Sequence, residues 1–162
     1  MDQKRFFSSM LALIFVGMVV YAWPGYAQVS KPITTSDGES PGTRVEVQEL
    51  KRSSGGTVTL KFTMINDSNG QLETGSRFGE SGQNKDFRSI GGITLIDPVS
   101  KKKYLVVRDS EGNCICSVGI PDINSKSRSN LWAKFPAPPQ DVKKVSIVIP
   151  HFIPMDDVPI GE

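Results

Sequence analysis

Two hydrophobic patterns divide the chain: one nearly continuous apolar run close to the N-terminus, and short alternating segments beyond residue 43. The apolar run extends from Phe6 to Val20 and is interrupted only by Ser8 and Ser9. It follows the basic pair Lys4 and Arg5. A basic start followed by an apolar run of this length is typical of a secretory signal peptide.

The residues after this run support cleavage and export. Gly25 and Ala27 are the small residues that a signal peptidase requires before Gln28. A transmembrane anchor is the alternative, but it needs about 20 apolar residues and this run has about 15. Pro24 would also break an anchor helix. We predict a helical signal peptide over residues 1–27, cleaved after Ala27, and a secreted or periplasmic protein without a stable membrane span.

Alternation of apolar and polar residues marks the strands of the remaining chain. The clearest case is Val58, Leu60, Phe62 and Met64, which are separated by Thr and Lys residues as in a strand with one buried face. Similar patterns predict strands at residues 44–48, 93–96, 104–107, 131–135 and 145–149, with a short one at 115–118. We predict that residues 93–107 form a hairpin and that Lys51–Gly56 is a turn.

Helical periodicity of 3.6 residues is absent from the sequence beyond the signal peptide. The strand count therefore predicts an all-β domain over residues 44–160, an immunoglobulin-like antiparallel β-sandwich of about seven strands. A small β-barrel is the alternative.

Two segments lack the strand pattern. Residues 28–43 are rich in Ser, Thr, Gly and Pro, and we expect a flexible leader there. Gln71–Ser89 is long, polar and rich in Gly, and such loops are often functional. It forms our candidate binding loop; the alternative is a surface loop without function that one or both of its Phe side chains hold in place. The candidate binding residues are Arg77, Phe78, Lys85, Phe87 and Arg88.

Charge excludes one class of partner. Removing Asp2, Lys4 and Arg5 with the signal peptide, from 17 acidic and 19 basic residues in all, leaves a net charge of +1. Such a balance provides no long-range attraction to nucleic acid or to anionic membranes. We expect no nucleic-acid partner.

The candidate chemistry is concentrated in Cys114 and Cys116, the two cysteines of the chain. In an exported protein such a pair usually forms a disulfide. In an ideal strand residues two apart are separated by roughly 6.5–7 Å, the upper edge of disulfide geometry. A turn after Ser110–Asn113 would shorten the gap, so we predict a bridge. Two free thiols or a soft-metal site are the alternatives, but a structural zinc site needs four ligands and the chain has one His. We expect no metal or other cofactor.

Catalytic motifs are missing from the sequence. It contains no nucleophile elbow and no phosphate-binding loop. The adjacent carboxylates of Asp156 and Asp157 would point apart in extended chain, and His151 follows the last predicted strand. The oxygen-bearing side chains from Asp67 to Glu73 lack the full calcium-loop pattern. We therefore predict that the protein is not an enzyme.

Three segments resemble bacterial exported immunoglobulin-like domains of unknown function: Tyr104–Ser117, Trp132–Pro139 and Ile149–Ile160. The first contains the Tyr-Leu-x-x-Arg-Asp strand and the Cys-x-Cys turn of those relatives. The chain is similar, over about residues 44–160, to secreted mycobacterial immunogenic-protein-type sandwiches and to the domain that precedes OmpA-type domains in some envelope proteins. The resemblance implies a sandwich fold but no settled activity.

These observations favour an exported, non-catalytic binding or structural module of the cell envelope whose partner is an unknown envelope protein or ligand. The competing hypothesis is a periplasmic metal-handling or thiol-redox protein that uses Cys114 and Cys116. A secreted inhibitor or effector is the third class.

Overall fold

The structure, a computed structural model, describes residues 31–80 and 86–162 and contains two four-stranded sheets. One sheet consists of β1 (Thr34–Asp37), β2 (Thr43–Ser53), β3 (Thr57–Asn66) and β6 (Ser127–Pro136). The other consists of β4 (Thr94–Ile96), β5 (Lys103–Leu105), β7 (Lys144–Val148) and β8 (Met155–Pro159). The predicted signal peptide lies outside the described residues.

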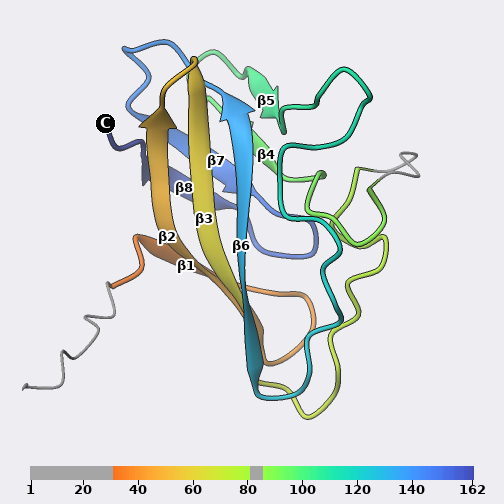
Figure 1. Ribbon diagram of the computed structural model, residues 1–162. Coiled ribbons are helices and arrows are strands. Elements are labelled where there is room, and N and C mark those ends of the chain that lie inside the picture. Colours follow the sequence, from red (N-terminus) through yellow and green to blue (C-terminus); the bar gives the residue numbers. More distant parts are fainter. Residues whose placement is uncertain (1–30, 81–85) are drawn as a thin grey trace, which may run out of the picture.

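The two sheets form two layers in which all neighbouring strands are antiparallel. The order β1-β2-β3-β6 makes the front layer of Figure 1, and the order β5-β4-β7-β8 makes the layer behind it. The described residues contain no α-helix. The all-β prediction is therefore confirmed at the level of two packed antiparallel sheets.

The hydrophobic core lies between the sheets and follows the predicted alternation. Val58, Leu60 and Met64 of β3 are fully buried, and so are Leu95 and Ile147 from the opposite sheet. Burial of an aliphatic side chain of this size stabilises the fold by about 1.5–3 kcal/mol relative to its exposure. Removing these residues from water therefore holds the two layers together.

The predicted hairpin after residue 93 is present. Leu95 of β4 pairs with Tyr104 of β5. The connecting turn is closed by Asp97, whose carboxylate accepts hydrogen bonds from the backbone N–H of Val99 at 2.9 Å and from the hydroxyl of Ser100 at 2.5 Å. These bonds to the ionised form, that from Ser100 first, hold the pKa of Asp97 below its ordinary value.

The strand β2 is longer than predicted. It continues through Ser53, which pairs with Thr57, so the start of the predicted turn at residues 51–53 is wrong. A bulge between Val47 and Glu49 shifts the register and turns Leu50 into the core, and the ladder then continues beyond the predicted strand. The turn between β2 and β3 therefore consists of residues 54–56.

Two strands were not predicted, and one of them corrects the flexible leader. Residues 34–37 form β1 and pair with β2, so the sheet begins before Arg44. The hydroxyl of Ser36 is buried and donates a hydrogen bond to the carbonyl of Ile153 at 2.5 Å. Backbone pairing, which alternation of side chains does not reveal, orders this polar segment. The other missed strand, β8, spans Met155–Pro159, with Pro154 before it and Pro159 at its end.

Hydrogen bonds also join the edges of the two sheets. On one side the backbone N–H of Gly161 donates to the carbonyl of Leu50 at 2.8 Å. On the other side the N–H of Val107, which follows β5, donates to the carbonyl of Lys134 in β6 at 2.8 Å. The predicted short strand at 115–118 is wrong, because the segment makes only isolated bridges, from Cys116 to Ala133 and from Val118 to Ser89.

Candidate functional site

The first residues of the candidate binding loop, Gln71–Ser89, are hydrogen-bonded to the segment that precedes β6. Leu72 exchanges two backbone hydrogen bonds of 2.9 Å with Ile123. The hydroxyl of Thr74 donates to the carbonyl of Ile120 at 2.8 Å, and its backbone N–H donates to the carboxylate of Asp122 at 2.9 Å. The second bond is the main reason why the pKa of Asp122 lies below its ordinary value. Residues 71–74 are therefore held by the neighbouring segment 120–124.

The two Phe residues of the loop have different roles. Phe78 is 1% exposed, and its ring centroid lies 6.2 Å from those of both Phe152 and His151. Phe87 is 62% exposed, with the guanidinium of Arg88 5.7 Å from its ring centroid. Phe78 therefore fastens the loop to the core, whereas Phe87 lies on the surface.

A buried ion pair fixes the other end of the loop. Arg108 donates two hydrogen bonds to the carboxylate of Asp86, at 3.0 and 2.6 Å, and a third to that of Glu80 at 2.7 Å. Asp86 is 2% exposed and also accepts the backbone N–H of Glu80 at 2.8 Å. Burial by itself would raise the pKa of Asp86, but the bonds from Arg108 and Glu80 outweigh it and the pKa is lowered.

Sequence reasoning missed this pair because Asp86 and Arg108 lie in separate segments. The glycines around Asp86 are the signal that could have indicated it. A Cβ added to Gly79 would lie 2.5 Å from the carbonyl oxygen of Asp86, and one added to Gly91 would lie 2.5 Å from its carboxylate. Such approach distances admit only glycine without a shift of the neighbouring atoms.

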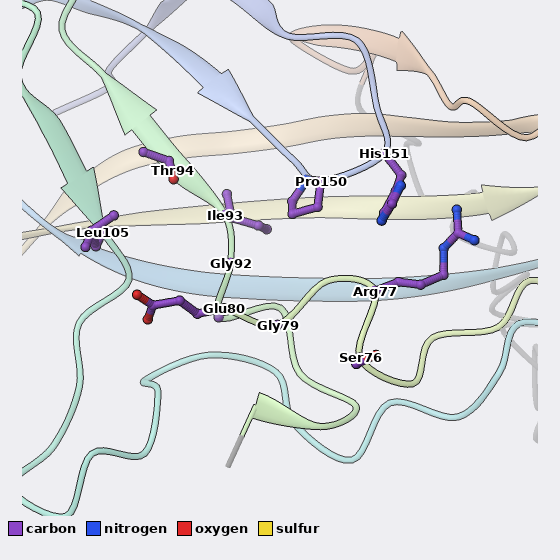
Figure 2. A pocket seen from close by; sticks show the side chains of 11 residues that line it. Ser76, Arg77, Gly79, Glu80, Gly92, Ile93, Thr94, Leu105, Pro150 and His151 are labelled. Carbon is purple, nitrogen blue, oxygen red and sulfur yellow. The ribbon is translucent and has the colours of Figure 1, made fainter. Parts of the chain in front are cut away.

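Between the loop and the second sheet lies a pocket of about 630 Å³ (Figure 2). Arg77 from the loop extends beside His151, which follows β7, while Glu80 points toward Leu105 at the other end. The pocket is lined by Ser76, Arg77, Gly79, Glu80, Gly91, Gly92, Ile93, Thr94, Leu105, Pro150 and His151.

The charges of this pocket are unevenly compensated. Glu80 pairs with Arg108, whereas Arg77 makes no ion pair with any described residue. The Nε of Arg77 is buried and has no hydrogen-bond partner in the described part of the chain. A desolvated donor without a partner is costly, and such a group in a native structure calls for a functional or structural explanation.

His151 is held in place by its own contacts. Its Nδ1 lies 2.8 Å from a carboxylate oxygen of Glu39, and its ring meets Phe78 edge to face at 80°. Its φ of 67° lies in the left-handed region, which is unfavourable for a residue with a Cβ. These constraints orient the imidazole beside Arg77.

The other predicted site residues that the structure describes do not line this pocket. Arg88 pairs with Asp122 at 3.3 Å and supports the loop. Lys85 lies outside the described residues. Cys114 and Cys116 form a disulfide with their Cα atoms 5.3 Å apart, and both residues are buried. The turn that precedes the pair brings these atoms closer than an ideal strand would.

Within the described ranges, no group of three or more His, Cys, Asp and Glu residues could hold a metal ion. In the same ranges no helix is long and apolar enough to cross a membrane. Comparisons of the chain with protein-family models, curated proteins and solved structures found no match. An assignment of function therefore rests on the residues and their geometry.

Proposed function

We propose that the protein is an exported, non-catalytic binding module of the bacterial cell envelope, built on an immunoglobulin-like sandwich. The two antiparallel sheets and the N-terminal export pattern support this proposal. Sandwich domains usually bind ligands through loops that a rigid pair of sheets positions. In this chain Phe78 and the Asp86–Arg108 pair provide that rigidity.

The observation that carries the proposal is the unpaired guanidinium of Arg77 at the pocket. A guanidinium is always charged and presents a planar set of donors that matches a carboxylate or a phosphate. Gly79 and Gly92 also line the pocket beside Arg77, so their amides can report a bound ligand. The ligand class is a small molecule or chain end that carries an acidic group.

The pocket offers weak support for catalysis. Glu39 orients His151 as a carboxylate orients a general base. A nucleophilic mechanism also needs a hydroxyl or thiol within hydrogen-bond reach of that base. Among the described residues, no Ser, Thr or Cys side chain is hydrogen-bonded to His151. Ser76 and Thr94 line the pocket but belong to other walls.

The test is a titration followed by amide NMR of the protein. Succinate and inorganic phosphate are the acidic probes, and succinamide is the neutral control. We expect saturable shifts at Arg77, Gly79 and Gly92 with an acidic probe, and none with succinamide. Deletion of the loop is unsuitable as a test, because it would remove Phe78 and Asp86 from the core.

A pair of matched variants locates the site. Arg77→Gln and Arg128→Gln each remove one positive charge. Arg128 is exposed at the start of β6, does not line the pocket and makes no ion pair with a described residue. The acid-dependent shifts should vanish in Arg77→Gln and persist in Arg128→Gln. Equal shifts in both variants, or equal shifts with succinamide, would refute the proposal.

A further inference from the structure

A second surface lies on the outer face of the first sheet, the face toward the viewer in Figure 1. Trp132 is placed there by the alternation of β6, because its neighbours Leu131 and Ala133 point into the core. Its side chain is 40% exposed on a face that is otherwise polar. Because β6 is the edge strand of this sheet, the exposed part of the indole lies near the border of the face, and its significance depends on the groups around it.

The indole borders a hollow of about 370 Å³ that crosses β2, β3 and β6. Trp132 stands directly opposite Lys61, and Asn130 stands directly opposite Thr63. Gln48 occupies the bulge of β2 at the third side of the hollow. The remaining lining residues are Phe62 and Leu131.

The polar groups of the hollow retain hydrogen-bonding capacity. The hydroxyl of Thr63 donates to the amide oxygen of Asn130 at 2.8 Å, which orients the Asn130 amide. Within the described part of the chain, the Asn130 NH₂, the Gln48 amide and the Trp132 indole N–H have no hydrogen-bond partner. Together these residues provide hydrogen-bond donors and an acceptor beside the indole.

The charge of the hollow is balanced. Lys61 is its ionic side chain, and its ammonium lies 3.1 Å from the carboxylate of Glu49 in the neighbouring strand. This pairing favours neither an anion nor a cation as occupant. A neutral ligand with many hydroxyl groups and an apolar face fits these features.

We propose that this hollow, the Trp132 groove, binds the sugar rings of a neutral glycan. The indole packs against the C–H face of a pyranose ring, as an aromatic side chain does with any flat apolar surface. The amides of Gln48 and Asn130 bond its hydroxyl groups. The inference goes beyond the proposed function, because the groove shares no lining residue with the Arg77 pocket.

The test is isothermal titration of the protein with cellohexaose and with chitohexaose, two neutral hexasaccharides. Trp132→Ala should weaken binding of the preferred one by at least about tenfold, because it removes the apolar contact. Ile153→Ala is the matched control, since Ile153 is 64% exposed between β7 and β8 and lines neither hollow, and the affinity of this variant should stay within about twofold of the parent. Thermal unfolding followed by circular dichroism verifies that each variant is folded.

Fluorescence locates the bound sugar independently. The chain has two Trp residues and Trp23 lies in the predicted signal peptide, so Trp132 is the sole indole of the protein from Gln28 onward. A saturable change in its emission on addition of the hexasaccharide, in a protein that stays monomeric by gel filtration, supports the proposal. Failure of both sugars to bind, binding that Trp132→Ala leaves unchanged, or self-association that this variant abolishes would each overturn it. Arg77→Gln should leave sugar binding intact. Sugar binding and acid binding can therefore be tested, and can fail, independently of each other.

Discussion

The Asp86–Arg108 pair offers the sharpest test of how the candidate loop is held. Replacing Arg108 by Met keeps much of the aliphatic packing but removes the hydrogen bonds to the 2%-exposed carboxylate of Asp86. Breaking a buried ion pair from one side generally costs about 3–5 kcal/mol, because the remaining charge is left without compensation. Since the side chain of Arg108 is 22% exposed, we expect a somewhat smaller cost, about 2–4 kcal/mol.

The assay is urea unfolding followed by circular dichroism at pH 7. Arg88→Met is the matched control, because Arg88 pairs with Asp122 through side chains that are 37% and 25% exposed. An ion pair with this exposure contributes about 0–1 kcal/mol, so its loss should change the free energy of unfolding little. The double variant Asp86→Asn/Arg108→Met should recover part of the stability that Arg108→Met loses, because the uncompensated charge is gone.

The pH dependence provides a second signature. In the parent the pKa of Asp86 is below its value in the unfolded chain, so its contribution is present above about pH 4 and is lost as pH falls through the folded value. In Arg108→Met the hydrogen bonds from Arg108 no longer oppose burial, so we expect the pKa of Asp86 to be raised. Its ionised carboxylate then destabilises the fold at neutral pH. The difference between the two proteins should therefore be largest near pH 7 and shrink below about pH 4. A difference under about 1 kcal/mol at pH 7, or one that grows in acid, would refute this reasoning.

Three further predictions concern the loop, the disulfide and the export signal. Gly91→Ala should lower the free energy of unfolding by roughly 1–3 kcal/mol, because the new Cβ would lie 2.5 Å from the Asp86 carboxylate. Gly70→Ala is the control, because the space around Gly70 is open. Equal melting temperatures for the two variants would contradict this account. Replacing Cys114 and Cys116 by Ser should cost about 1–2 kcal/mol, as expected for so short a closed loop, and thiol titration of the native parent should find no free thiol. Reactive thiols in the native protein would instead favour the redox hypothesis. N-terminal sequencing of the protein from the producing cells should begin at Gln28, whereas recovery of uncleaved chain in the membrane fraction would argue for an anchor.

Alternation along the chain was sufficient to predict the strands that bury one face. Val58 to Met64 became β3 because every second side chain leaves water, a local property that the sequence displays directly. The same reasoning could not find β1, whose order comes from backbone pairing and from the buried Ser36 hydroxyl. It also missed β8, an edge strand that lies between Pro154 and Pro159 and has the adjacent polar residues Asp156 and Asp157 in place of an alternating pattern.

The same distinction between local pattern and tertiary contact applies to the candidate sites. The sequence by itself indicated export, an all-β domain, a cysteine pair close enough to bridge, and a loop worth inspecting that contains Arg77. Only the tertiary structure decided that Arg77 faces a pocket without a counter-ion, that Asp86 meets Arg108, and that Trp132 borders a hollow with free amides. Periodicity reports which side of a strand is buried, whereas the compensation of a charge depends on side chains that folding brings together from distant segments.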